Sequence, residues 1–155
     1  MGNNTLIAFD PDPIHLGLVK TFKATSAILR GSVVSFATAG ASRTVEPATT
    51  STGMPIGVAL NSQATVGGEV TVAMQGSVVK VLQQLDNTAM DAGHYVTSGA
   101  TAGTVAALDP AVKAHAGKAT EGAEVIGITL DDFAGTAMAY GYILINPSPR
   151  WALNA

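Results

Sequence analysis

The chain offers few residues that could do chemistry, and they lie far apart in the sequence. The three histidines are His15, His94 and His115. None lies at metal-ligand spacing from another, and no His-Glu-x-x-His motif is present. We therefore interpret them as surface residues and predict no metal site.

The acidic residues give no stronger indication of catalysis. Asp131 and Asp132 are adjacent, whereas general acid–base catalysis needs two carboxylates across a cleft. Adjacent strand residues point to opposite faces, so this pair is typical of a strand that ends at a turn. Asp86 and Asp91 flank a predicted short helix, but their spacing does not match a calcium-binding EF-hand loop.

Other catalytic and cofactor signatures are also missing. The 155 residues include no cysteine, which excludes disulfides, thiolate nucleophiles and cysteine-ligated metal centres. Neither a Gly-x-Ser-x-Gly elbow nor a phosphate-binding loop occurs. We therefore expect no enzymatic activity and no cofactor. A small β-barrel enzyme stays open as an alternative, because one sequence does not show which residues folding brings together.

Composition limits the class of protein further. Hydrophobic residues make up 47% and charged residues 12% of the chain, which excludes disorder. A net charge of -3 argues against a general nucleic-acid binder, which needs a basic face. No apolar run is long enough to span a membrane, and the N-terminus lacks the basic region of a secretory signal. We expect a soluble protein, made in the cytoplasm and left unprocessed.

The elements that would position any binding surface are short strands separated by glycine-containing turns. The predicted strands cover residues 19–25, 32–37, 55–60, 69–74, 77–82, 95–97, 104–108, 124–130 and 138–145. This spacing predicts an all-β fold with little helix, a small β-barrel over residues 19–146.

Local signals add detail to this prediction. The runs 69–74 and 77–82, separated by Gln75-Gly76, predict a hairpin. Residues 38–52 read as a loop with at most an edge strand, because Pro47 cannot donate to a ladder. Residues 83–93 predict a short helix that stops at Gly93. The segment Asn146-Pro147-Ser148-Pro149 is expected to end the last strand.

Two strands of similar sequence form an internal echo. Ile56-Gly57-Val58-Ala59-Leu60 resembles Ile126-Gly127-Ile128-Thr129-Leu130, with glycine at the same place. A glycine inside a strand marks a bulge or a close backbone approach. Two copies are too few to indicate a repeat architecture, so we expect two similar strands within one barrel or sandwich.

The two ends of the chain carry the predicted binding residues. Leu6, Ile7 and Phe9 precede Asp10-Pro11-Asp12-Pro13, which excludes a helix. We predict that residues 1–18 form an extended arm that adds to a partner's sheet edge; a flexible terminus is the alternative. In the tail, residues 147–155, Arg150 and Trp151 are predicted to anchor an interface. Alternatively, the Trp151 ring covers the open end of the barrel.

An ordered set of small-residue motifs runs through residues 30–130. They are Gly31-Ser32-Val33-Val34, Val45-Glu46-Pro47-Ala48-Thr49, Pro55-Ile56-Gly57-Val58-Ala59, Gly68-Glu69-Val70-Thr71-Val72, Gly76-Ser77-Val78-Val79-Lys80-Val81, Ala92-Gly93-His94-Tyr95-Val96 and Val125-Ile126-Gly127-Ile128. In this order they resemble the capsid cement, or head decoration, proteins of tailed phages.

The resemblance implies a β-tulip-like domain similar to the lambda-type decoration proteins. It implies a homotrimer at the three-fold and quasi-three-fold sites of an expanded head, bound to the major capsid protein on the outer surface of the virion. Such a protein stabilises the shell against the pressure of packaged DNA, and the family has no catalytic residues to transfer. In related proteins an N-terminal arm often contacts the capsid, which fits the predicted capsid-binding residues Leu6, Ile7 and Phe9. No arm motif of the family matches them residue by residue, so their assignment rests on the composition of the arm.

A second interpretation keeps the virion surface but changes the partner. A host-binding or fibre-base module could have the same Thr-rich β composition. The aromatic residues that could contact a carbohydrate are few, namely Tyr95, Tyr140, Tyr142 and Trp151. The sequence leaves this alternative open.

Overall fold

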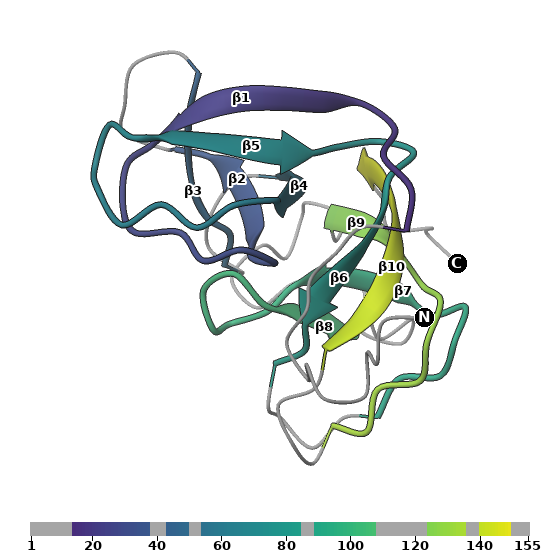
Figure 1. Ribbon diagram of the computed structural model, residues 1–155. Coiled ribbons are helices and arrows are strands. Elements are labelled where there is room, and N and C mark those ends of the chain that lie inside the picture. The colour runs from purple at the N-terminus through teal and green to yellow at the C-terminus, as the bar shows by residue number, and fades with distance from the viewer. Residues whose placement is uncertain are drawn as a thin grey trace, which may run out of the picture.

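Figure 1 shows that the described part of the chain is built from β-strands. The computed structural model describes residues 14–37, 43–49, 54–84, 89–107, 124–135 and 140–149. The strands are β1 (Val19–Ala24), β2 (Val33–Phe36), β3 (Thr44–Pro47), β4 (Pro55–Ala59), β5 (Glu69–Ala73), β6 (Val78–Leu82), β7 (Tyr95–Ser98), β8 (Val105–Ala107), β9 (Glu124–Thr129) and β10 (Tyr140–Pro149). Within these ranges no helix is long and apolar enough to cross a membrane. The predicted all-β class is confirmed.

Strands β1 to β5 form a closed barrel, the first barrel, with neighbours in the order β1, β3, β2, β4, β5. β5 returns to pair antiparallel with β1, from Val19 opposite Ala73 to Lys23 opposite Glu69. β1 also pairs in parallel with β3, where Ala24 lies opposite Val45. Every strand therefore has two neighbours, which removes exposed sheet edges. The predicted class of small β-barrel is confirmed, with the closed barrel formed by β1 to β5.

Strands β6 to β10 form the second sheet, in the order β6, β10, β9, β7, β8. The pairings between neighbouring strands in this sheet are antiparallel. Among the described residues, one parallel bridge, between Gln83 and Val105, joins its two outer strands. The Gln84 amide also donates to the Val105 carbonyl at 2.8 Å. The second sheet therefore curls toward the same closed form, although fewer backbone pairs between described residues close it.

The two halves of the chain share one pairing plan. When β1 to β5 are matched with β6 to β10 in chain order, every pair of neighbouring strands in the first barrel has an equivalent pair in the second half. The register agrees as well, since Val33 opposite Val58 in β2 and β4 becomes Tyr95 opposite Ile128 in β7 and β9. The parallel pair Ala24 and Val45 becomes the bridge between Gln83 and Val105. The described part of the chain is therefore a structural duplication, in which two five-stranded units with the same pairing plan follow one another.

The turns that follow β4 and β9 repeat the same hydrogen bonds. The amides of Leu60 and Leu130 each donate at 2.8 Å to a carbonyl of the next strand, that of Thr71 or Tyr142. A bridge closes each turn, Ile28 to Gln63 in the first half and Met90 to Phe133 in the second. The echo between the two Ile-Gly strands therefore marks the duplication. The two strands do not share one barrel, since β4 belongs to the closed barrel and β9 to the second sheet.

The hairpin predicted for β5 and β6 is also wrong. The chain does turn at Gln75-Gly76, where the Ser77 amide donates to the Met74 carbonyl at 3.1 Å. However, β5 pairs with β1 and β4, whereas β6 pairs with β10. Residues 14–18 lie along this turn, and Leu18 exchanges hydrogen bonds with Met74 and Gln75. Since other segments take up the backbone groups beside the turn, the two strands enter different sheets.

Two further predictions are corrected. β3 lies in the region predicted as a loop with at most an edge strand, yet it pairs with both β1 and β2. Pro47 is its last residue, where a missing N–H disturbs the ladder least. β10 does not end at Asn146 but pairs with β9 again at Ser148, after a register shift. The shift accommodates Pro147, because a residue in a bulge need not donate to the ladder.

The predicted helix over 83–93 is absent from the described residues of that range. Gln83 and Met90 instead make isolated β-bridges. Residues 85–88 lie outside the described part of the chain.

Two clusters of buried apolar side chains stabilise the molecule. One fills the first barrel and consists of Ala24, Ile28, Val34, Val45, Ile56, Ala59, Val70 and Val72. The larger cluster joins side chains of the second half to residues from the outer side of the first barrel, namely Val33, Ala48, Val58 and Ala73. Because side chains alternate along a strand, Val33 points outward while Val34 points into the barrel.

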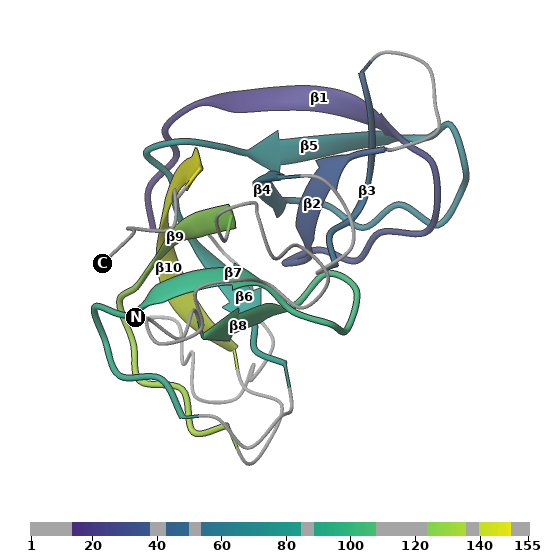
Figure 2. The same cartoon turned by 180° about the vertical axis from the view of Figure 1, so that it is seen from behind.

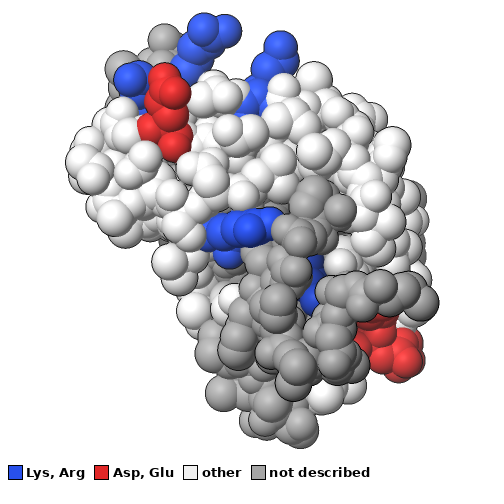
Figure 3. Space-filling view, in the orientation of Figure 1, with Lys and Arg blue, Asp and Glu red and all other residues white. Residues whose placement is uncertain are grey.

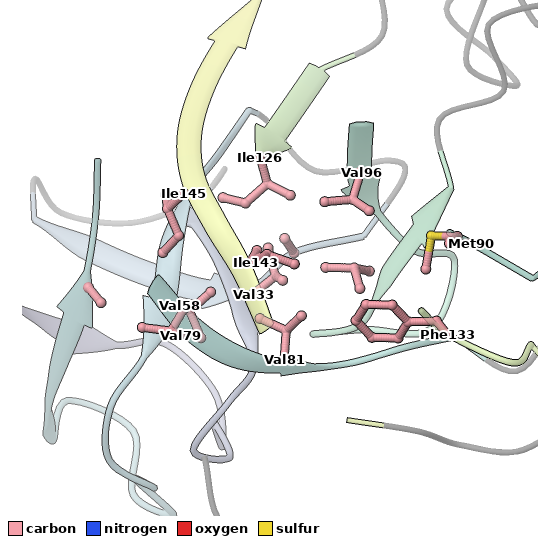
Figure 4. Close-up of a cluster of buried hydrophobic side chains, with 13 residues drawn as sticks. Val33, Val58, Val79, Val81, Met90, Val96, Ile126, Phe133, Ile143 and Ile145 are labelled. Atoms are coloured by element: carbon pink, nitrogen blue, oxygen red, sulfur yellow. The ribbon is translucent and has the colours of Figure 1, made fainter. Parts of the chain in front are cut away.

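The wall of the first barrel therefore covers one end of the second sheet. Figure 2 shows the first barrel above the second sheet, and β4 packs against β9 and β10. Val58 lies beside Val79 in the close-up of Figure 4. Both side chains are almost fully buried, and complete burial of a valine contributes about 1.5–3 kcal/mol. The two halves are thus joined by core packing as well as by the chain.

Candidate interaction surfaces

The residues predicted to bind a partner lie outside the described part of the chain. This applies to Leu6, Ile7 and Phe9 in the arm and to Arg150 and Trp151 in the tail. Their assignment as capsid-binding residues and as an interface anchor therefore stays a prediction. His115 and Asp86 also lie outside the described residues.

The adjacent aspartates and the two described histidines take part in turns and strand pairing. The Asp131 carboxylate accepts a hydrogen bond from the Tyr142 amide at 2.7 Å, and that of Asp132 accepts one from the Ala92 amide at 2.8 Å. The His94 Nδ1 accepts a hydrogen bond from the Asp91 amide at 3.3 Å, and the His15 backbone pairs with Val78. The turn interpretation of Asp131 and Asp132 is therefore confirmed. Within the described ranges, no group of three His, Asp or Glu residues could hold a metal ion.

The second half presents an apolar row on its outer side. Tyr95, Ile128 and Leu144 lie opposite one another on β7, β9 and β10, and Val78 continues the row on β6. We call Tyr95, Ile128 and Leu144 the outer row of the second sheet. Tyr95 is 46% exposed, whereas Ile128 and Leu144 are half-buried. Uncharged residues in neighbouring positions form the type of surface that proteins use to bind other proteins.

Residues 14–18 extend this surface. His15 and Val78 exchange backbone hydrogen bonds in an antiparallel bridge, so the segment lies beside the start of β6. The Gly17 amide donates to the Ser77 hydroxyl at 2.9 Å, which fixes the segment against the turn. Ile14, Leu16 and Leu18 are all exposed. Additional apolar area therefore adjoins the outer row of the second sheet.

One end of the first barrel carries aromatic side chains. Phe36 is 51% exposed, and its ring meets that of Phe22 edge-on with centroids 5.8 Å apart. Met74 is half-buried, and Lys20 is exposed at the start of β1. We call Lys20, Phe36 and Met74 the free end of the first barrel. By strand register, Lys20, Phe36 and Met74 are equivalent to Val79, Ser98 and Ile145 of the second half. Those three residues lie at the end of the second sheet that the wall of the first barrel covers.

Charge is sparse on the described surface. Figure 3 shows uncharged atoms over most of the described surface on one side of the molecule, with Lys, Arg, Asp and Glu in a few separate groups. Near the outer row, the Lys80 ammonium lies 5.3 Å from the centre of the Tyr142 ring. Such a pair places the charge over an aromatic face and keeps the surroundings largely apolar. The arrangement suits shape-complementary protein contacts better than binding of a charged polymer.

Neither the outer row nor the free end was predicted as a site from the sequence. Tyr95 was predicted only as a candidate carbohydrate contact, and Ile128 and Phe36 lay in predicted strands. Their partial exposure depends on which faces the two halves bury against each other. The internal echo was the signal that could have led to them, because it aligns Val58 of the buried wall with Ile128 of the outer row.

Comparison with known proteins shows a likeness to a solved structure. No protein-family model and no curated protein matches the chain. Among solved structures, the N base of the head fibre gp8.5 of bacteriophage phi29 is similar, with a TM-score of 0.55 and 16% sequence identity. The match covers 83% of this chain and 93% of that one. At this identity the likeness shows that the two chains share a fold.

Proposed function

We propose that the chain is a structural protein of a phage virion that binds the outer surface of an expanded head and stabilises the shell. Its partner is the major capsid protein, and it acts as a trimer at three-fold and quasi-three-fold sites. The observation that carries this proposal is the fold shared with a phage head fibre base over 83% of the chain. The order of the small-residue motifs, which resembles that of head decoration proteins, supports it independently.

The described surface suits such a role. Apolar rows with sparse charge favour contacts between proteins and limit repulsion between densely packed copies. A protein that binds only the expanded shell stabilises that state by mass action. Because the three copies of a trimer would bind the shell together, weak contacts by each copy are sufficient for tight attachment.

The arm completes the proposed attachment. Leu6, Ile7 and Phe9 would pair with an exposed strand of the capsid protein, where main-chain hydrogen bonds give affinity and side-chain pockets give specificity. Residues 14–18 are held along the turn between β5 and β6. This segment fixes the point from which the preceding residues start. Arg150 and Trp151 would add an anchor of the residue types enriched at interface hot spots.

Co-sedimentation with undecorated heads tests the proposal. The purified chain is mixed with compact and with expanded heads, and the bound amount is measured per capsid subunit. We expect saturable binding to expanded heads alone, at a regular ratio. Absence of binding to either form, or equal binding to both, would overturn the proposal.

A deletion of residues 2–13 tests the arm. It leaves the hydrogen bonds of residues 14–18 in place, so the β-domain should keep its stability in a denaturation curve. We expect head binding to fall at least tenfold. A matched variant with Leu6, Ile7 and Phe9 all changed to Ser keeps the length of the chain and should lose the same affinity. Unchanged binding by both would show that the arm does not attach the protein.

A fibre-base module is the second candidate, because the similar structure is itself described as a head fibre base. Heat release of packaged DNA separates the two functions. Heads saturated with the chain should release DNA at a higher temperature if the protein stabilises the shell. Saturable binding without any change in the release temperature would favour the fibre-base function.

A further inference from the structure

The contact between the two halves provides a template for a second contact. Inside the chain, the outer wall of the first barrel, at Val33, Val58 and Ala73, covers the end of the second sheet at Val79 and Ile145. These residues are 0–1% exposed. Backbone hydrogen bonds seal the joint, because Gly103 accepts from the Val33 amide and donates to the Ala48 carbonyl, each at 2.9 Å.

The duplication supplies the same two surfaces once more. Register equivalence places the outer row of the second sheet, Tyr95, Ile128 and Leu144, where the first barrel has Val33, Val58 and Ala73. The turn residue Leu60, which packs on the internal joint, corresponds to Leu130, which is 45% exposed.

The free end of the first barrel is the second of these surfaces. Its residues Lys20, Phe36 and Met74 take the places of Val79, Ser98 and Ile145 in the second sheet. The side chains Val79 and Ile145 are fully buried under the barrel wall, whereas Phe36 is 51% exposed. The internal joint thus buries the outer wall of the first barrel and the end of the second sheet. Their equivalents, the outer row of the second sheet and the free end of the first barrel, stay exposed.

We propose that a second copy of this chain docks head to tail on these surfaces. The outer row of the second sheet of one copy packs on the free end of the first barrel of the next copy. The contact repeats the internal joint between the two halves, so its geometry continues an interface that already exists in the molecule. The inference depends on the duplication alone and holds whether or not the protein attaches to a head.

The substitutions between the two surface pairs fit an intermolecular contact. At the outer row, Tyr95 and Leu144 are larger than Val33 and Ala73, and Phe36 on the free end is larger than Ser98. Tyrosine and phenylalanine are enriched at the centres of protein interfaces, where large side chains fill pockets of the partner. The contact is heterologous, since different patches meet, and it therefore produces a ring if the rotation closes and a filament if it does not.

Sedimentation velocity of the free chain, without heads, tests this inference. Leu130→Lys places a charge beside the outer row, and Phe36→Lys places one on the free end. Both side chains are about half exposed, so the variants should fold. Val66→Lys is the matched control, because Val66 is 70% exposed and lies between β4 and β5, outside both surfaces. We expect the wild type and Val66→Lys to associate and each of the other two variants to be monomeric.

Mixing the two defective variants gives the decisive measurement. Phe36→Lys keeps an intact outer row and Leu130→Lys keeps an intact free end, so one good contact can form between them. The mixture should yield a dimer that does not grow further. A wild type that stays monomeric to about 500 µM, far above the micromolar range of specific contacts, would overturn the inference. So would a mixture that stays monomeric, or association of either variant alone.

Discussion

The two halves of the chain have one strand plan but close it by different means. In the first barrel, backbone pairing closes the ring, since β1 pairs with both β3 and β5. In the second half, the part of the chain that the structure describes has one bridge, Gln83 to Val105, between the outer strands. That half instead has the larger core cluster, which includes Phe133, Met90 and the wall of the first barrel. Among the described residues, the half with fewer closing backbone pairs thus has the larger buried cluster, and the same fold tolerates either arrangement.

The largest difference in stability between equivalent substitutions in the two halves is expected at the bridge that closes the turn after β4 or β9. Phe133 is 2% exposed and its ring lies over Gly141, whereas its equivalent Gln63 is half-buried. The Gln63 side chain donates to the Glu69 carbonyl at 3.2 Å and accepts from the Thr65 amide at 3.1 Å. Phe133→Ala should cost about 3–5 kcal/mol. Gln63→Ala should cost about 0.5–1.5 kcal/mol.

Urea denaturation measures both values. Val66→Ala, at an exposed site, is the control and should change stability by less than about 0.5 kcal/mol. Equal losses for Phe133→Ala and Gln63→Ala would contradict the view that side-chain burial replaces backbone closure in the second half.

The two strand glycines test the equivalence itself. A Cβ at Gly57 would meet the Ala73 carbonyl oxygen, and one at Gly127 would meet that of Leu144, which holds the equivalent place. Since backbone cannot move aside cheaply, Gly57→Ala and Gly127→Ala should each cost about 1–3 kcal/mol. Thermal unfolding would compare them with Ala134→Val, an exposed enlargement that should be nearly neutral. If one glycine variant were neutral, the two strands would not be equivalent.

Gln83 tests the weaker closure of the second half. Its side-chain oxygen accepts a buried hydrogen bond from the Gly135 amide at 3.1 Å, while its equivalent in the first barrel is Ala24. Gln83→Ala therefore introduces the residue type found at the equivalent position of the first barrel. It also leaves the buried Gly135 amide without this acceptor. We expect a loss of about 1–3 kcal/mol.

Hydrogen exchange locates this effect. The Gly135 amide should exchange faster in Gln83→Ala, and Gln84→Ala serves as the control because the Gln84 side chain accepts from Thr101 in an exposed turn. Unchanged protection of Gly135 would show that the bond does not help to close the second half.

The strands could be predicted from the sequence, but their partners could not. Periodicity and glycine turns placed β4 and β9 within a residue or two, because local patterning decides whether a segment is extended. The hairpin of β5 and β6 failed although its turn was correct, since residues 14–18 and β10 pair with the turn and the start of β6. Pairing is a competition among distant segments, which local patterning does not describe.

The duplication was hidden for a related reason. The connection from β8 to β9 is much longer than that from β3 to β4, so the equivalent residues have no constant spacing. Their types also differ, as at Gln63 and Phe133, because each half covers its ends with different neighbours. The Ile-Gly motif is present in both halves because a Cβ at either glycine would collide with a carbonyl oxygen of the neighbouring strand. The candidate surfaces follow from which walls the two halves bury, and this depends on how the halves pack against each other.

The smallest expected effect concerns the turns after β4 and β9. Asn61 accepts a hydrogen bond from the Thr71 amide and Asp131 accepts one from the Tyr142 amide, both at 2.7 Å. One turn uses an amide oxygen and the other a carboxylate at the same place. Asp131→Asn should therefore change stability by less than about 0.5 kcal/mol, whereas Asp131→Ala should cost about 1 kcal/mol because the amide loses its acceptor. Denaturation curves for both variants, recorded together, decide the point. A loss for Asp131→Asn as large as that for Asp131→Ala would show that this turn needs the charge rather than the acceptor, and the two turns would then be alike in shape but not in what stabilises them.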